Sequence, residues 1–441
     1  MNTLVVLMGL LLLSYLGAFL TRSKAHPGFG AAGLPSSSEF LVVGVLAGPL
    51  VFHAVTKSSL ESFDPIAYVA AGWLALWSGL EYGHVRGRRV SLGRTALGMV
   101  LALACGGAVA GATWLAVPWL TPLSFGDRLL LAGGAGCVCA ESSRHAIEWT
   151  VQRHRAHGPV TALLRDLSHA DELAPIAAVS LLFALRPPAY ATIHLPPIGW
   201  VGVTFGMGLL LGALTALLLG RDLRVAESWG TLIGISLMTI GLAARLDLAA
   251  LTSMFALGAS IALFSRHGAD VRAMVRTTER AVVLPALVLA GARIDPVSIG
   301  KLWMIVPVAI GVRLVVKLLA GQLLRVRGPA REAGALLGLG LASSGGMSVL
   351  IGLAMALRFP GPIGDTVLAI AVAVSVVGEV AGPVLRRVLD RVGEIPLPTD
   401  VEQAATTGAL DAADAADGAG AGSIDPDAPD DALQTGPEAA P

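Results

Sequence analysis

Two adjacent carboxylates, Asp171 and Glu172, lie inside an apolar stretch of the chain, "LLRDLSHADELAPIAAVSLLFAL" at residues 163–185. A charge at the centre of a bilayer costs at least about 2.5–3.5 kcal/mol, so ionisable residues inside membrane helices are mostly functional. Carboxylate oxygens are hard ligands for small cations. Each carboxylate can also take up a proton, since burial and a like-charged neighbour both favour the neutral form. The pair therefore indicates cation and proton binding.

Pro175 follows this pair one helical turn later. Because proline has no N–H, the backbone oxygen of Asp171 is left without its helical partner. Free backbone oxygens at membrane depth are tolerated only where they are buried in protein or line a watery cavity. The alternative is that both carboxylates lie near a cytoplasmic helix end marked by Arg165 and Asp166, about one and a half turns away.

A basic partner is present in another apolar stretch, "LWMIVPVAIGVRLVVKLLAGQLL", which carries Arg313 and Lys317 one turn apart. Lys317 precedes Arg325 by eight residues, which places it roughly 12 Å from that helix end. We expect Lys317 to pair with Asp171 or Glu172 inside the bundle. Snorkelling of the lysine to the membrane surface is the alternative.

Two further apolar stretches carry polar interruptions. Glu141, Ser142 and Ser143 interrupt "LLLAGGAGCVCAESSRHAIEWTV", and Ser343, Ser344 and two glycines interrupt "GALLGLGLASSGGMSVLIGLAMAL". Interruptions of this kind in two corresponding helices indicate an ion site built from discontinuous helices. Glu141, Ser142 and Ser344 are therefore candidate site residues beside Asp171 and Glu172.

The composition indicates a polytopic membrane protein. The chain has 441 residues, of which 54% are hydrophobic and 14% charged, whereas soluble domains carry about 25% charged residues. Apolar runs of about 20 residues, long enough to cross a bilayer, recur along it. The first run is expected to remain as a helix, with a cleaved signal peptide as the alternative. The thirteen predicted spans are 2–20, 39–55, 66–82, 93–118, 127–148, 160–186, 198–220, 227–243, 247–265, 279–293, 300–325, 333–357 and 363–388.

Basic residues cluster in every second connection between these spans. By the positive-inside rule, this places the N-terminus outside and the C-terminus in the cytoplasm of a multi-pass protein of the plasma (inner) membrane. The clusters are Arg22/Lys24, Arg86/Arg88/Arg89, Arg153/Arg155, Arg221/Arg224, Arg266/Arg272/Arg276, Arg325/Arg327/Arg331 and Arg386/Arg387/Arg391.

The last part of the chain, residues 396–441, is rich in Ala, Asp, Gly and Pro and holds no Lys or Arg. It lacks the apolar surface that would offset the entropy of ordering, so we expect a disordered acidic cytoplasmic tail. Residues 1–395 then form the transmembrane domain. The three cysteines have no C-x-x-C spacing, and no nucleotide-binding loop is present, so neither a cofactor nor a nucleic-acid partner is expected.

Several ordered motifs resemble one family. They are "GLPSSSEFLVVGVLAGPL", "AYVAAGWLALWSGLEYGHVR", "DELAPI", "VVKLLAGQLL", "GLASSGGMSVLIG" and "LAIAVAVSVVGEVAGPVLRRVLDRVGEI". In order and spacing they resemble the monovalent cation:proton antiporter superfamily, the sodium/proton exchangers, over about residues 28–395.

The resemblance implies an all-α fold with inverted repeats, two broken helices that cross near the midplane, and a homodimer. It implies that Glu172 is the titrating carboxylate, that Asp171 is its neighbour and that Lys317 is their basic partner. The chain departs from the family in having Glu where the second acid is usually Asp. It also has Ala140-Glu141-Ser142-Ser143 where the family often has threonine and proline, so Glu141 could alter the choice of ion.

These residues favour a secondary active antiporter that exchanges protons for Na⁺, or another monovalent cation such as K⁺ or Li⁺, by alternating access. Proton and cation would compete for Asp171 and Glu172. A Na⁺-coupled carrier of an organic anion on a related inverted-repeat fold is the alternative. An intramembrane aspartyl protease is disfavoured because "GPIGD" at 361–365 is not the Gly-x-Gly-Asp that such an enzyme needs. A channel would need a selectivity-filter repeat, and none is evident, so we expect a transporter and not an enzyme.

Overall fold

The computed structural model describes residues 38–52, 57–83, 92–186, 195–219, 225–326 and 328–396, and every regular element in these ranges is a helix. The predicted span 2–20 and residues 397–441 of the predicted tail lie outside the described residues.

Each of the twelve predicted spans between residues 39 and 388 contains one helix or a pair of consecutive helices. Six helical segments of the described chain are individually long and apolar enough to cross a membrane. The chain is therefore an all-α polytopic membrane protein. The helices are α2 (Ser38–Ala47), α3 (Lys57–Glu61), α4 (Asp64–Gly83), α5 (Leu92–Leu120), α6 (Phe125–Ala140), α7 (Arg144–Arg153), α8 (Pro159–Ala170), α9 (Leu173–Ala184), α10 (Pro197–Leu218), α11 (Val225–Arg245), α12 (Ala250–Phe264), α13 (Gly268–Ala292), α14 (Pro296–Ile299), η1 (Gly300–Met304), α15 (Ile305–Arg325), η2 (Gly328–Glu332), α16 (Leu337–Gly340), α17 (Gly346–Arg358), α18 (Pro362–Gly378) and α19 (Ala381–Arg391).

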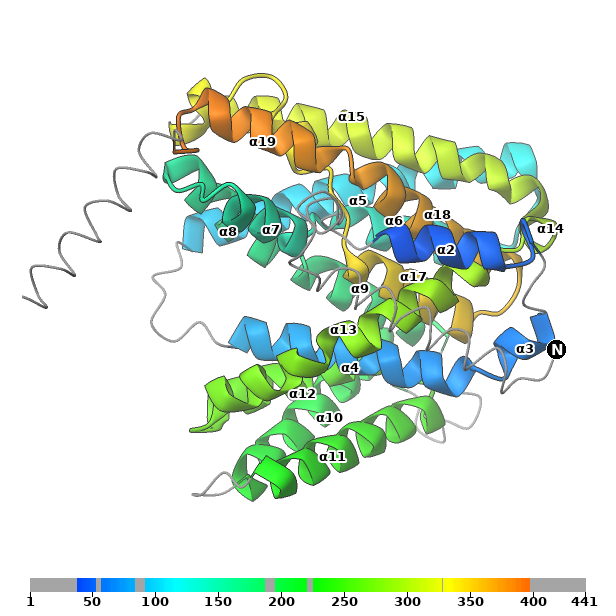
Figure 1. The fold of residues 1–441 in the computed structure, drawn as a ribbon. Coiled ribbons are helices and arrows are strands. Elements are labelled where there is room, and N and C mark those ends of the chain that lie inside the picture. Colours follow the sequence, from blue (N-terminus) through cyan, green and yellow to red (C-terminus); the bar gives the residue numbers. More distant parts are fainter. Residues whose placement is uncertain are drawn as a thin grey trace, which may run out of the picture. The chain divides into compact units, whose positions relative to one another are not determined.

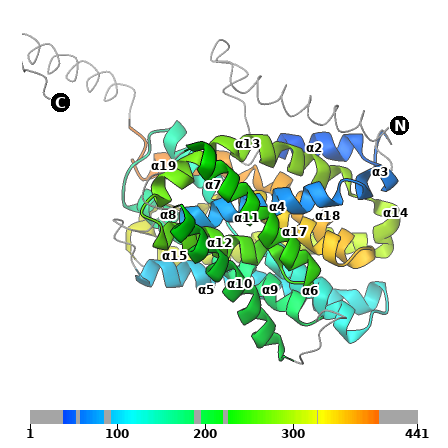
Figure 2. The same cartoon turned by 90° about the horizontal axis from the view of Figure 1, so that it is seen from below.

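The helices pack as two bundles (Figure 1). In the first, which we call the scaffold bundle, α4 packs on α12 and α13, α10 packs on α11 and α12, and α2 lies along α13 (Figure 2). In the second, which we call the core bundle, α5 packs on α6, α8 and α15, and α17 packs on α18 and α6. The core bundle comprises α5–α9 and α14–α19.

Glycines allow the scaffold helices to touch through their backbones. A Cβ on Gly79 of α4 would lie 2.1 Å from the carbonyl oxygen of Phe255, and a Cβ on Gly258 of α12 would lie 2.1 Å from that of Leu76. Small residues permit such close approach between membrane helices, where packing replaces the hydrophobic effect as the source of association. The α4–α12 contact is thus fixed by the absence of side chains at these positions.

Both predicted helix interruptions are confirmed. Residues 141–143 separate α6 from α7, and residues 341–345 separate α16 from α17. A third interruption lies at Asp171 and Glu172, between α8 and α9, where both residues keep helical φ and ψ angles. Pro175 explains this local opening, because the helix loses the hydrogen bond that a residue 175 N–H would donate.

The described basic connections gather at one end of the bundle, which we call the basic end. There α7 contacts α8 and α19, and η2 contacts α8 and α15 (left in Figure 1). The connections between α5 and α6 and between α17 and α18, which hold few basic residues, lie at the opposite end.

Gly79→Ala should destabilise the protein, since its methyl group would meet the Phe255 carbonyl and force α4 away from α12. Overpacking of this kind costs about 1–3 kcal/mol. Thermal unfolding of purified protein in detergent measures the effect. Gly111→Ala on α5 is the control, because a Cβ there meets nothing within 4 Å. Equal melting temperatures for the two variants would contradict this account of the α4–α12 contact.

Candidate ion-binding site

The first and second helix interruptions meet inside the core bundle. The Ser143 N–H donates to the Ser343 carbonyl oxygen at 3.0 Å. The Gly345 N–H donates to Glu141 Oε1 at 2.9 Å. Two backbone segments, two hundred residues apart in the chain, are therefore hydrogen-bonded to one another inside the core bundle.

Arg313 of α15 joins these two segments. Its Nε donates to the Cys139 carbonyl at 3.0 Å and its Nη1 to the Ala342 carbonyl at 2.9 Å. Its Nη2 donates to the carbonyls of Glu141, at 2.6 Å, and Ser343, at 3.1 Å. Only 2% of Arg313 is exposed. The planar guanidinium, with five donors, suits this task, and the carbonyls at a helix C-terminus carry partial negative charge.

Lys317 lies one turn further along α15 and is 4% exposed. Its ammonium donates to Ser142 Oγ at 2.6 Å and to the Ala140 carbonyl at 3.2 Å. Lys317 makes no ion pair within 4.0 Å with Asp171 or Glu172, all three being described residues. In place of the predicted direct contact, the ammonium binds the Ala140 carbonyl at the end of α6 and the Ser142 hydroxyl. Snorkelling is also excluded by the burial.

Ser142 links the lysine to the acidic pair. While its hydroxyl accepts from Lys317, its backbone N–H donates to Asp171 Oδ2 at 2.9 Å. The positive charge and the carboxylate are thus coupled through one serine rather than by direct contact.

Two carboxylate oxygens in this cluster are buried without a partner in the described part of the chain. They are Asp171 Oδ1 and Glu141 Oε2, on residues that are 4% and 2% exposed. Buried polar atoms are nearly always hydrogen-bonded, and each exception calls for a reason such as a bound ion. Asp171 and Glu141 can therefore offer oxygens to a cation or a proton.

The two acidic neighbours have different surroundings. Asp171 faces the interruption after α6, whereas Glu172 is partly exposed and faces the charges of Arg144, Glu141 and Glu81. Ser344 lies in the interruption before α17, as expected, but its hydroxyl donates to Ser348 Oγ at 2.7 Å. The structure thus joins Asp171, Ser142 and Lys317 by hydrogen bonds, with the Glu141 carboxylate bonded to Gly345 of the facing segment. Ser344 bonds within its own segment.

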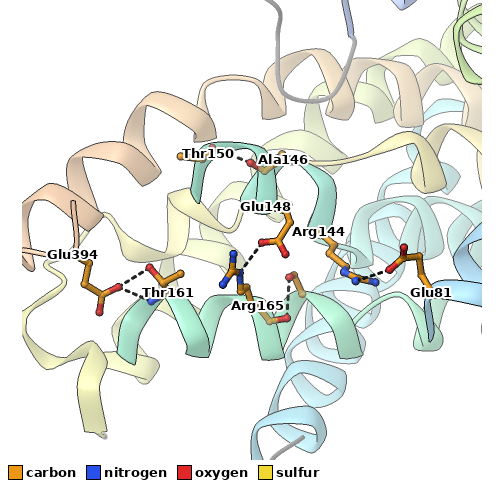
Figure 3. Close-up of polar contacts among 9 residues, drawn as sticks. Glu81, Arg144, Ala146, Glu148, Thr150, Thr161, Arg165 and Glu394 are labelled. Carbon is orange, nitrogen blue, oxygen red and sulfur yellow. Dashed lines mark hydrogen bonds and ion pairs between the residues drawn. The ribbon is translucent and has the colours of Figure 1, made fainter. Parts of the chain in front are cut away.

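Two ion pairs join α7 to neighbouring helices near the basic end (Figure 3). Arg144 Nη2 lies 3.0 Å from Glu81 Oε2, which joins α7 of the core bundle to α4 of the scaffold bundle. Arg165 Nε lies 2.6 Å from Glu148 Oε2, which joins α8 to α7 within the core bundle.

Glu394 fixes the start of the helix that leads to Asp171. Its carboxylate accepts from the N–H groups of Val160, at 2.6 Å, and Thr161, at 2.7 Å, and from Thr161 Oγ at 2.7 Å (Figure 3). A carboxylate at the positive end of a helix is stabilising. The sequence showed Glu394 only as part of a closing Gly-Glu-Ile motif, and Arg313 only as a charge beside Lys317, so neither role was predicted.

No family model and no curated protein matches this sequence. Among solved structures, the fold is similar to that of the sodium/proton antiporter MjNhaP1 from Methanocaldococcus jannaschii, with a TM-score of 0.63. The similarity covers 89% of this chain and 100% of that chain at 12% identity. It confirms the predicted fold class, an all-α membrane bundle with interrupted helices.

Arg313→Lys should destabilise the protein severely, because one ammonium cannot reach four carbonyl oxygens spread over two segments. Hydrogen bonds to charged groups contribute about 1.5–3 kcal/mol each, so we expect the melting temperature in detergent to fall well below that of the unmodified protein. Arg128→Lys is the matched control, since among the described residues Arg128 donates to a single carbonyl, that of Trp114, and lies over the ring of the same residue. An Arg313→Lys protein as stable as the control would contradict the role assigned to Arg313.

Proposed function

We propose that this protein is a secondary active antiporter that exchanges protons for a monovalent cation, Na⁺ being the first candidate and K⁺ and Li⁺ the others. The observation that carries the proposal is the pair of buried, unpartnered oxygens, Asp171 Oδ1 and Glu141 Oε2, where two helix interruptions meet. The similarity of the fold to a sodium/proton antiporter supports it.

The two unpartnered carboxylate oxygens favour a single exchangeable positive charge. Asp171 and Glu141 lie at the helix interruptions, and each keeps one oxygen without a partner among the described residues. Because uncompensated charge is costly away from water, either one proton or one monovalent cation can neutralise this site. Proton and cation then exclude one another, and the release of one accompanies the binding of the other.

The transport cycle that we propose is alternating access, in which the core bundle moves against the scaffold bundle. The core bundle contains the whole acidic cluster, whereas the scaffold bundle contributes Glu81 at its edge. The basic end faces the cytoplasm of the plasma (inner) membrane in this proposal, since positive residues are retained on that side. A homodimer, in which two scaffold bundles meet, is the proposed assembly.

Reconstituted liposomes loaded with a pH-sensitive dye test this function. A jump in Na⁺, K⁺ or Li⁺ should change the lumenal pH without any organic solute present. A Na⁺-coupled carrier of an organic anion would give no pH change until its solute was added, so one experiment separates the two functions.

Glu172→Gln should abolish exchange while leaving the protein folded, because an amide cannot release a proton. The measurement is the dye signal after a cation jump, with elution on size-exclusion chromatography as the test of folding. Glu148→Gln is the control, since Glu148 pairs with Arg165 at the edge of the cluster. Exchange that persists at more than a small fraction of the unmodified rate would remove Glu172 as the proton carrier.

Glu141→Gln should weaken cation binding while the fold is kept, because the amide oxygen can still accept from Gly345 but carries no charge. We expect the cation concentration for half-maximal exchange to rise about tenfold, which corresponds to about 1.4 kcal/mol. Titration of the exchange rate against cation at fixed pH measures it. An unchanged dependence on cation would make Glu141 a structural residue only.

A further inference from the structure

An ion pair also joins the two bundles at the end opposite to the basic end. Arg358 Nη1 lies 3.1 Å from Asp247 Oδ1, and the two side chains are 20% and 29% exposed. Arg358 is the last residue of α17 in the core bundle, and Asp247 lies in the turn between α11 and α12 of the scaffold bundle. Relative movement of the bundles must therefore stretch or break this pair.

Asp247 occupies a position where glycine is usual. The Leu248 N–H donates to the Ala243 carbonyl at 2.8 Å and the Asp247 N–H to the Ala244 carbonyl at 3.3 Å, which is the Schellman pattern at the end of a helix. Asp247 has a φ of 54°, in the left-handed region that glycine adopts at least cost. A carboxylate at this strained position indicates that its side chain makes a contact that glycine could not make, here the ion pair with Arg358.

Arg358 also lies at the ends of α9 and α17 that are farthest from the candidate ion site. Its Nη2 donates to the Arg186 carbonyl, just after α9, at 3.3 Å. Its guanidinium lies 5.6 Å from the ring centroid of Phe359, which packs edge-on against Phe183 of α9. Since α9 starts after Glu172 and α17 starts after Gly345, both helices connect the candidate ion site to the surroundings of Arg358.

A small cavity lies between the bundles beside this ion pair. It is lined by Ser180 and Phe183 of α9, Trp200 and Thr204 of α10, and Asp247 itself. Ser180 is 1% exposed, and its hydroxyl has no partner among the described residues. It lies eight residues beyond Glu172, about 12 Å along the helix. An unpaired hydroxyl thus lies between the acidic cluster and the opposite end of the molecule.

We propose that Arg358 and Asp247 form a latch that closes the ion route at this end, and that Ser180 lines the route behind it. The inference rests on the proposed antiport function. When the core bundle moves against the scaffold bundle, the ion pair separates, the cavity opens to water, and the Ser180 hydroxyl can contact the hydrated cation. The pair re-forms when the site turns to the basic end.

The same end of the molecule offers a matched control. Asp127, in the first turn of α6, is paired with Arg186, just after α9, and both belong to the core bundle. This pair does not span the two bundles, so it has no reason to break during transport.

Labelling of a cysteine at position 180 tests the latch. In a background without Cys105, Cys137 and Cys139, Ser180→Cys is reacted with a water-soluble maleimide in lipid nanodiscs, which expose both membrane faces. Arg358→Gln or Asp247→Asn should speed the labelling about two- to fivefold, the range expected for a partly exposed ion pair. Asp127→Asn should leave the rate unchanged, and the charge-reversed pair Asp247→Arg with Arg358→Asp should restore slow labelling.

Cross-linking provides a second measurement. With cysteines in place of Asp247 and Arg358, a short reducible cross-linker should stop exchange in liposomes, and reduction should restore it. Full exchange with the cross-link in place, or equal labelling rates in the latch and control variants, would overturn the proposal. The labelling assay needs no transport, so absence of exchange in the unmodified protein would defeat the antiport function alone.

Discussion

The hydrogen bonds of Arg313 are the interaction on which the rest of the site depends. Two interrupted helices leave backbone carbonyls unpaired at membrane depth, where no bulk water can satisfy them. One guanidinium binds four of these oxygens, from Cys139, Glu141, Ala342 and Ser343. Each interruption therefore supplies two of the four acceptors that keep this buried positive charge stable.

The local chemistry of the site follows from that arrangement. Because Arg313 and Lys317 already satisfy the backbone oxygens after α6, the carboxylates of Asp171 and Glu141 keep one oxygen each for a ligand. Gly345 belongs to the same arrangement. A Cβ there would lie 2.8 Å from Ser143 Oγ and 3.0 Å from Glu141 Oε1, so a side chain would displace both Ser143 and the Glu141 carboxylate to which the Gly345 N–H donates.

The sequence predicted the twelve spans between residues 39 and 388, both interruptions and the acidic residues near them, because these depend on local apolar runs and on polar residues within them. It did not predict the partner of Lys317. Whether that ammonium meets Asp171 or Ser142 depends on where the end of α6 lies relative to α15, a distance between residues 175 positions apart. The capping of α8 by Glu394 spans 234 positions and has no local pattern either. A local sequence pattern does not show which of several possible partners, far away in the chain, a buried polar group will contact.

The glycine contacts inside each bundle differ in kind from the ion pairs that join the two bundles. Every described glycine whose added Cβ would come within 2.5 Å of a backbone atom packs against its own bundle, as Gly44 does on Val288 and Gly338 does on Lys317. Across the boundary, α9 packs on α10 and α17 packs on α4, and Thr252 Oγ1 donates to the Ile176 carbonyl at 3.1 Å. The ion pairs Glu81–Arg144 and Asp247–Arg358 join the two bundles at opposite ends. Backbone contacts through glycine tolerate little displacement, whereas partly exposed ion pairs exchange readily with water. The ion pairs at the two ends of the boundary are thus the contacts across it that separate at least cost when one bundle moves against the other.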